Sequence, residues 1–136
     1  MRTLALLLLL CAAGCASVKM TRAFNGVKVD GGYTPLATVS VETTGWFLFN
    51  FIPLASGNPE RPNETDWLFF RNTVSLDNNM KMLDVTMRQQ GATCFEHLTS
   101  HLKDDFYYFF ILYRRTCQTS AVILRAEDNP VQAKLP

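Results

Sequence analysis

The chain has 136 residues, of which 48% are hydrophobic and 18% charged, and its 13 Lys and Arg against 12 Asp and Glu leave a formal net charge of +1. A chain of this length forms one domain with a sizeable core, so a second domain is not expected. The balanced charge argues against a nucleic-acid partner, because phosphate binding requires a clustered positive surface. The densest basic spot, Arg114-Arg115, is interpreted as the polar end of a strand.

Residues 1–14 have the three regions of a secretory signal. A single basic residue, Arg2, precedes the uncharged run Leu4 to Leu10, and small residues stand immediately before Cys15. The run is shorter than the about 20 apolar residues that a membrane-spanning helix needs. We therefore predict a signal peptide that is removed on export.

The segment Cys11-Ala12-Ala13-Gly14-Cys15 resembles the lipobox of bacterial lipoproteins, with Ala12 where Leu is usual. The resemblance implies that Cys15 carries a diacylglycerol thioether and an acylated amino group, with fatty acyl chains such as palmitate. Two or more such chains give stable membrane anchoring. Ala16 stands where many lipoproteins carry the Asp that signals inner-membrane retention, which favours the periplasmic face of the outer membrane. The alternative is cleavage by an ordinary signal peptidase, which leaves a soluble secreted protein that begins at Cys15.

The composition after the signal predicts how the mature chain is divided. Residues 15–26 are expected to be the lipidated cysteine and a flexible tether, because they are short or polar and show little periodicity. A single domain is expected over residues 27–126, followed by a frayed tail at 127–136. A short strand at residues 27–29 would open the domain, before a glycine-rich turn.

A hairpin is predicted in the first half of the domain. Residues 37–43 alternate between apolar and polar, which is the period of a half-buried strand. Thr43-Thr44-Gly45 is expected to turn the chain into a second strand at residues 46–52. Pro53 should end that strand, since it cannot donate a ladder hydrogen bond.

An exposed loop is expected over residues 56–66, which are rich in Gly, Pro, Asn and Glu. The apolar residues 67–70 that follow are either a further short strand or an apolar lid on the loop.

Residues 75–90 are the clearest helix in the sequence. Ser75 or Thr73 can cap its start, Asp77 and Arg88 suit the helix dipole, and Gly91 supplies the stop. The spacing of four apolar residues predicts one stripe that packs on a sheet, and these are Leu76, Met80, Leu83 and Met87.

The last third of the chain predicts strands at residues 92–99, 106–113 and 119–124, with a polar turn at 101–105. The last two strands are either separate or one long bent strand. The resulting order of strand, strand, helix, strand, strand indicates an α+β fold, in which one amphipathic helix packs on a face of a small antiparallel or mixed sheet.

Cys94 and Cys117 remain after the signal and the anchor are accounted for. A disulfide is allowed in an oxidising envelope, but it requires adjacent strands with Cα atoms about 5.5 Å apart. The alternative is two buried thiols.

Chemical motifs are few. Cys94, His97 and His101 are metal-ligand types, but on a strand the first two point to opposite faces, and we interpret them as structural. Ser100, His101 and Asp104 are the residue types of a hydrolytic triad, yet such close neighbours cannot easily supply nucleophile, base and orienter. We expect no enzyme activity, no metal and no other cofactor.

Two aromatic runs, residues 46–52 and 106–113, are apolar at both odd and even positions. In a strand such residues point to both faces, and one helix can cover only one of them. The second face needs a cover, which is the chain itself, a second copy or envelope partner, or lipid. The predicted interaction face comprises Trp46, Phe47, Phe49, Phe51, Phe109, Phe110 and Tyr113.

The globular part resembles small lipoproteins of bacterial envelopes through residues 45–49, 52–54 and 113–115, which implies only an envelope domain of unassigned role. We prefer the hypothesis of a membrane-anchored structural or interaction module that docks an envelope protein or its own copy. The alternative is a small-molecule binding protein for a lipid or glycan fragment, whose orienting polar groups would be Asn50, Tyr107, Tyr108 or Tyr113.

Overall fold

The computed structural model describes residues 16–22, 32–64, 66–107 and 111–126. Over these ranges the chain forms one helix and a six-stranded, wholly antiparallel sheet, so the α+β class is confirmed. The predicted order of strand, strand, helix, strand, strand is wrong, because two further short strands join the sheet. The elements are β1 (Ser17–Thr21), β2 (Tyr33–Leu48), β3 (Ile52–Gly57), β4 (Trp67–Phe69), α2 (Leu76–Gln89), β5 (Cys94–Tyr107) and β6 (Leu112–Ala126).

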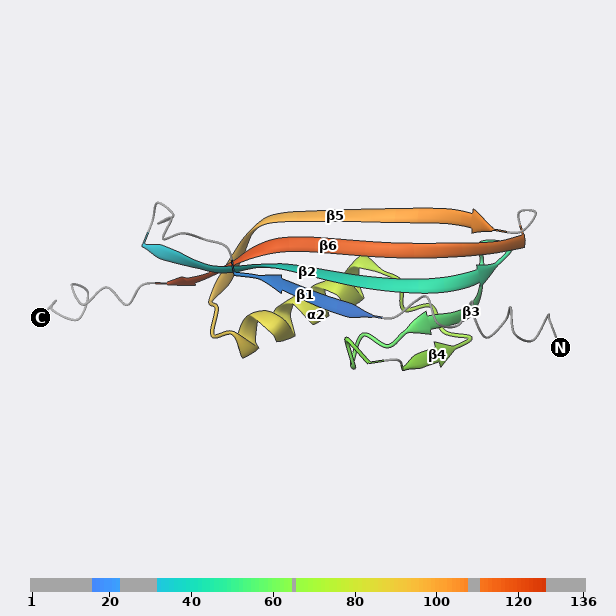
Figure 1. The fold of residues 1–136 in the computed structure, drawn as a ribbon, viewed down its shortest axis with the longest axis horizontal. Coiled ribbons are helices and arrows are strands. Elements are labelled where there is room, and N and C mark those ends of the chain that lie inside the picture. Colours follow the sequence, from blue (N-terminus) through green and yellow to red (C-terminus); the bar gives the residue numbers. More distant parts are fainter. Residues whose placement is uncertain (1–15, 23–31, 65, 108–110, 127–136) are drawn as a thin grey trace, which may run out of the picture.

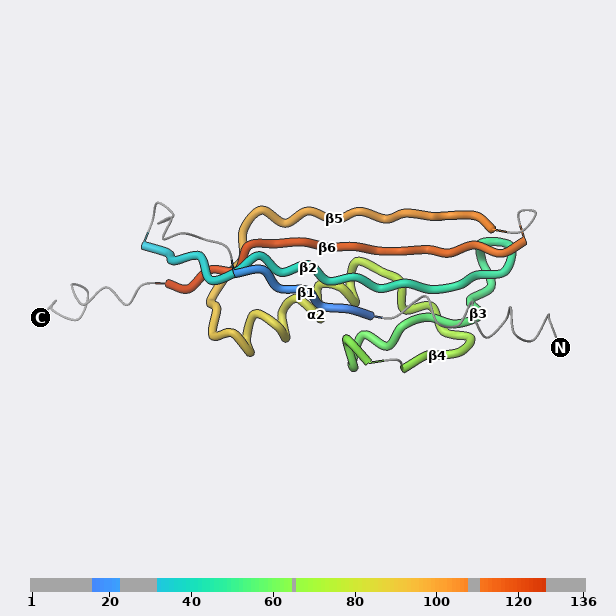
Figure 2. Tube along the Cα trace, in the orientation of Figure 1, coloured from blue at the N-terminus to red at the C-terminus, as the bar shows by residue number. Residues whose placement is uncertain are grey.

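The strand order is β4-β3-β2-β6-β5, and β1 pairs with β2 on the edge that β3 also uses (Figure 1). Three long strands, β2, β6 and β5, run side by side along the molecule (Figure 2). The pairing of β2 with β6 extends from Tyr33↔Ala126 to Leu48↔Leu112. This pair is therefore the spine to which the shorter elements attach.

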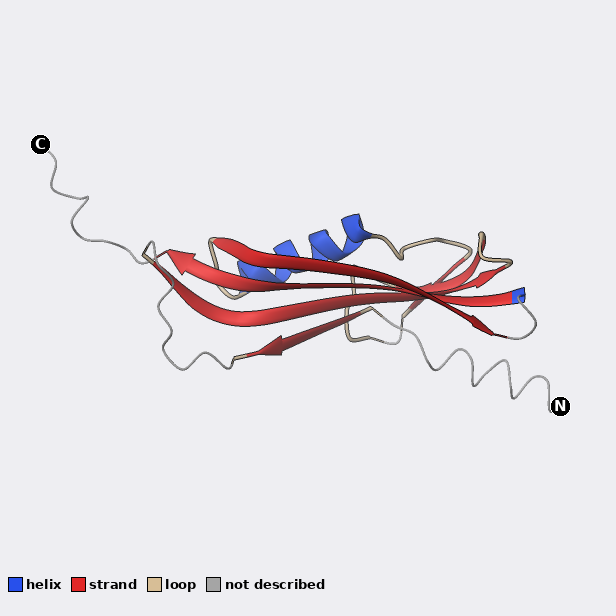
Figure 3. Cartoon of the chain, turned by 90° about the horizontal axis from the view of Figure 1, so that it is seen from above, coloured by secondary structure: helices blue, strands red, loops and turns tan. Residues whose placement is uncertain are grey.

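Helix α2 covers one face of this sheet, and no helix of the described residues covers the other (Figure 3). Val39 and Val41 of β2 are buried on the helix side, as the alternation predicts. Ser40 lies on the opposite side, where its hydroxyl accepts from Gln118 of β6 at 3.1 Å. Much of the second face is thus polar and hydrogen-bonded.

The predicted turn at residues 43–45 is wrong, because β2 continues through it to Leu48. The chain turns instead at Phe49 and Asn50, whose φ values of 51° and 66° are typical of a type I′ hairpin turn. Gly45 serves a different purpose, since a Cβ there would lie 2.8 Å from Val74 Cγ2. The glycine permits close packing rather than a turn.

The residues after this turn also differ from expectation. Pro53 lies inside β3, opposite a register shift between Trp46 and Phe47 that accommodates a residue without an N–H. The exposed loop begins after Gly57, and residues 67–69 form the edge strand β4.

The predicted helix is confirmed, with Ser75 as N-cap and Gly91 at φ 65° just beyond its end. Of the predicted stripe, Leu83 is buried in the core and Met80 and Met87 pack against it, whereas Leu76 is 48% exposed. The core-facing side combines apolar and polar residues, namely Asn79, Met82, Leu83 and Thr86.

Asn79 is fully buried and joins the helix to both central strands. Its amide oxygen accepts from the Thr43 hydroxyl at 2.9 Å, and its amide nitrogen donates to the Cys117 carbonyl at 2.8 Å and to Thr119 Oγ1 at 3.2 Å. Because both the oxygen and the nitrogen of this amide are hydrogen-bonded, Asn79 can occupy a core position where an apolar side chain is usual.

β5 is one continuous strand through residues 101–105, where a polar turn was predicted. Its irregularity lies earlier, at a register shift between Glu96 and Thr99 where His97 has φ 53°. The following strand, β6, begins only at Leu112. The predicted strand at 106–113 is therefore divided, because residues 106–107 end β5, whereas residues 112–113 belong with the predicted strand 119–124 to β6.

The predicted tether is wrong for the residues that the structure describes, because Ser17–Thr21 pair with β2 as β1. Ala16 is fully buried, and its carbonyl accepts from the Asn63 backbone N–H at 2.8 Å. The Asn63 side chain in turn accepts from the Val18 N–H at 2.9 Å. The signal, Cys15, residues 23–31 with the expected short strand, and the tail at 127–136 lie outside the described residues.

Within the described ranges, no helix combines the length and the apolar character needed to cross a bilayer.

Replacing Gly45 with alanine is expected to lower the free energy of unfolding by about 1–3 kcal/mol, because the added methyl group overlaps Val74. Urea denaturation measures the change. The double variant Gly45→Ala/Val74→Ala serves as the control, since removing Cγ2 vacates the contested space. If the losses in free energy of unfolding caused by Gly45→Ala and by Val74→Ala simply add in the double variant, the packing role of Gly45 is contradicted.

Candidate functional site

The predicted interaction face does not form a single surface. Trp46 and Phe47 are adjacent in β2, point to opposite faces and are only 6% and 1% exposed. Tyr113 is half-buried and packs against Phe47 in a cluster with Val74 and Cys117. Phe109 and Phe110 lie outside the described residues.

The exposed aromatic side chains gather where the long sheet ends. Phe49 and Phe51 occupy the β2–β3 turn, are 50% and 73% exposed, and stack with ring centroids 6.4 Å apart. The Phe49 N–H donates to the Ile111 carbonyl at 2.7 Å, which ties this turn to the start of β6. We call Phe49, Phe106 and Ile111, all exposed, the hairpin tip.

A second exposed group adjoins the hairpin tip at the edge formed by β3 and β4. Phe70 is 76% exposed and its N–H donates to the Leu54 carbonyl at 3.2 Å, so it continues the pairing of β4 with β3. We call this group the β3–β4 corner, and it consists of the exposed side chains Phe51, Ile52, Phe69 and Phe70.

Arg115 of β6 holds this end of the molecule together. Its guanidinium donates to both carboxylate oxygens of Asp104 on β5, at 2.8 and 3.1 Å, and to Asn50 Oδ1 in the β2–β3 turn at 2.9 Å. The same group lies 4.9 Å from the centroid of the Phe47 ring. The hydrogen bond to Asp104 is the main reason that the pKa of Arg115 is raised. The guanidinium group of Arg115 therefore links β6 to both the β2–β3 turn and β5 through charge-assisted hydrogen bonds.

The face opposite the helix carries a different group at the same end. Trp46 lies directly across from Arg114 on β6, and its ring centroid is 5.4 Å from that of Tyr107. The indole Nε1 and the Arg114 Nε are buried and have no hydrogen-bond partner among the residues that the structure describes. Both donors remain unpaired in this arrangement, which costs free energy.

The predicted interaction face does not include Ile52, Phe69, Phe70, Phe106 or Ile111. The signal for Phe69 and Phe70 is the apolar run that follows the polar loop. This run predicts either a short strand or an apolar lid on the loop. Phe106 and Ile111 flank the tip of the β5–β6 hairpin, within the second aromatic run. The two runs were predicted as strand interiors, whereas their exposed members lie at strand ends and turns.

Cys94 and Cys117 do not form a disulfide in this structure. Cys94 pairs with Leu124, whereas Cys117 pairs with Leu102, eight residues further along β5. At about 3.3 Å per residue this separation is roughly 26 Å, far beyond disulfide reach. Burial raises the pKa of the Cys117 thiol, although hydrogen bonds with Ser100 and Thr119 act in the opposite direction.

The other polar side chains of β5 are dispersed. The Ser100 hydroxyl oxygen lies 3.1 Å from the Thr119 hydroxyl oxygen, on the helix side of the sheet. His101 pairs with Gln118, and its side chain lies on the opposite side. The Asp104 carboxylate is held by Arg115. Among the described residues, no three His, Cys, Asp or Glu side chains are grouped as metal ligands.

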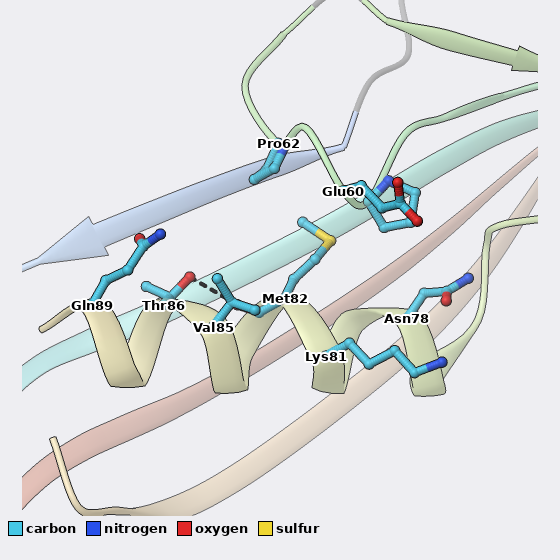
Figure 4. Close-up of a pocket in the computed structure, with 9 residues that line it drawn as sticks. Glu60, Pro62, Asn78, Lys81, Met82, Val85, Thr86 and Gln89 are labelled. Atoms are coloured by element: carbon cyan, nitrogen blue, oxygen red, sulfur yellow. Dashed lines mark hydrogen bonds between the residues drawn. The ribbon is translucent and has the colours of Figure 1, made fainter. Parts of the chain in front are cut away.

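A shallow groove of about 310 Å³ lies between the β3–β4 loop and helix α2 (Figure 4). Pro59 and Pro62 form the loop side, and Met82 and Val85 form the helix side, with polar groups such as Lys81 at the rim. Of the residues proposed from the sequence to orient a ligand, Tyr108 lies outside the described residues, and the other three do not line the groove. Asn50 is bound instead to Arg115, and Tyr113 packs in the core.

Comparison of the chain with protein-family models, with curated proteins and with solved structures found no match. The assignment of a function therefore depends on the site itself.

Replacing Arg115 with methionine is expected to lower the free energy of unfolding by about 1–2 kcal/mol, because it removes three charge-assisted hydrogen bonds at a partly exposed site. Urea denaturation gives the overall change, and hydrogen exchange at the Phe49 amide reports release of the hairpin tip. The control is Arg88→Met, which breaks the exposed pair with Asp84 and should cost less than about 0.5 kcal/mol. Equal effects of the two variants would contradict the organising role of Arg115.

Proposed function

We propose that this chain is a lipid-anchored, non-catalytic interaction module of the bacterial cell envelope. A signal over residues 1–14 directs export, Cys15 carries the lipid, and the domain stands on the periplasmic face of the outer membrane. The hairpin tip docks an envelope protein or a second copy of the chain. This role requires no cofactor and no nucleic acid.

The observation that carries the proposal is the exposure of the hairpin tip. Phe106 is 62% exposed, and Phe49 and Ile111 are exposed beside it. Bare apolar surface is unfavourable by about 25 cal/mol per Å², and contiguous apolar patches on soluble domains usually mark interaction sites. Because Arg115 ties the turn to β5 and β6, the tip is presented in a fixed arrangement, which reduces the entropy lost on docking.

The start of the described chain defines where the proposed lipid would be attached. Cys15 is bonded to Ala16, which is buried in the core and hydrogen-bonded to Asn63. A lipid on Cys15 would therefore hold the folded domain directly, with no spacer between them.

A small-molecule binding protein for a lipid or glycan fragment is the second candidate, and the groove of about 310 Å³ favours it. Its size is at the lower end for ligand pockets. Native mass spectrometry of the purified protein would detect a copurified ligand as added mass. The variant Val85→Trp, whose side chain fills the groove, should lack this added mass. A protein that carries no added mass would count against this candidate.

Replacing Cys15 with serine is expected to move the protein from the membrane fraction to the soluble fraction, because the acyl chains have no other attachment site. The intact mass of the wild-type protein should correspond to residues 15–136 plus a diacylglycerol and an acyl group. Cys94→Ser is the matched control and should stay with the membrane. An unmodified thiol at Cys15, or membrane retention of Cys15→Ser, would refute the anchor.

A photoreactive phenylalanine analogue at Ile111 is expected to cross-link to a protein in intact cells, because the hairpin tip is the docking surface. The analogue at Leu76, an exposed apolar position on α2, is the control and should give no adduct. Ile111→Glu should weaken self-association of the soluble Cys15→Ser protein at least about tenfold if the partner is a second copy. A monomeric protein without Ile111-specific adducts would rule out the docking role.

A further inference from the structure

The position of the anchor relative to the sheet is defined by hydrogen bonds. Ala16 packs beside Met82 and Leu83 in the core, and Asn63 binds both Ala16 and Val18. Asn63 belongs to the loop that joins β3 to β4. The residue next to Cys15 is therefore fastened to the connection that leads into β4.

Three short strands share this side of the sheet. β1 and β3 both pair with the edge of β2 that is not used by β6, and β4 pairs with β3 (Figure 1). The start of β1 lies opposite Glu42, and the end of β3 lies opposite Gly45, so the two strands nearly meet along β2. β5 forms the opposite edge, beyond β6.

The anchored side of the sheet also carries the β3–β4 corner. Phe69 and Phe70 stand at the end of β4, Ile52 opens β3 and Phe51 precedes it, so the corner lies at the end of this short hairpin opposite to the loop that binds Ala16. All four side chains are exposed. Arg71, also exposed, follows directly and can reach lipid phosphates.

We propose that the β3–β4 corner inserts into the headgroup and acyl boundary of the same bilayer that holds the Cys15 lipid. The inference rests on the anchor of the proposed function. Phe and Leu side chains are the usual apolar contacts of proteins that lie in this boundary. Because there is no spacer after Cys15, the effective concentration of lipid at the corner is high, and insertion costs little further ordering.

This arrangement gives the molecule an orientation. The edge of β1, β3 and β4 lies opposite the edge of β5 (Figure 1). In the proposed orientation the first edge faces the membrane and the second faces away from it. The bilayer covers the corner, and Phe106 and Ile111, the members of the hairpin tip that belong to the β5–β6 hairpin, stay available for a protein partner.

The test uses the full lipidated protein in vesicles of phosphatidylethanolamine and phosphatidylglycerol. Spin labels are placed in a Cys94→Ser background at Phe70→Cys, in the corner, or at Leu98→Cys, an exposed apolar position on β5. Cys117 is 2% exposed and should not take the label. Paramagnetic relaxation by oxygen, which partitions into lipid, is compared with relaxation by a water-soluble nickel chelate.

We expect the label at position 70 to be more accessible to oxygen than to nickel, and the label at position 98 to show the inverse ratio. A label at Phe69→Cys should repeat the result at position 70. Preferential nickel access at both corner positions would overturn the inference, and so would lipid contact at position 98 alone. Shielding of position 70 from both reagents would also overturn it, since that result indicates a protein contact.

The mass of the same preparation separates this inference from the proposed function. If Cys15 carries its acyl chains and the corner labels are in water, the anchor stands and only the orientation is wrong. If Cys15 carries no acyl chains, both the anchor and the orientation are refuted.

Discussion

The antiparallel pairing of β2 with β6 is the constraint on which the remaining structure depends. Its register places Thr43 and Thr119 around the buried Asn79 amide, which attaches helix α2 to both strands. The same register brings Arg115 to the β2–β3 turn, where it binds Asn50. A slip of one residue would reverse every side chain between the two faces and would lose both networks at once.

The two faces of the spine are stabilised by different means. On the helix side, apolar residues such as Val39 and Ile123 exclude water. On the other side, hydroxyl and amide groups such as Ser40, Ser120 and Gln118 bond to one another across the strands. A polar face of this kind tolerates solvent and needs no second layer. The exposed aromatic side chains of the described residues are concentrated at one end of the sheet, in turns and strand ends.

That distribution relates the fold to the proposed function. A sheet that ends in exposed aromatic groups can use two neighbouring surfaces for different contacts, and the attachment of β1 decides which lies nearer the anchor. Because Ala16 is hydrogen-bonded to Asn63, the proposed anchor would lie on the β3–β4 side. The hairpin tip, organised by Arg115, lies at the end of the long strands. The proposed anchoring and docking would therefore use neighbouring parts of one sheet.

The sequence alone determined the features that depend on near neighbours: the helix with its Ser75 cap, the alternation of residues 37–43 and the polar loop before β4. These follow from periodicity and capping within a few residues. Only the tertiary structure decided that Gly45 lies under Val74 instead of in a turn, that Cys94 and Cys117 are far apart, and which aromatic side chains are exposed. Those outcomes depend on the register between strands distant in sequence, and no local pattern encodes that register.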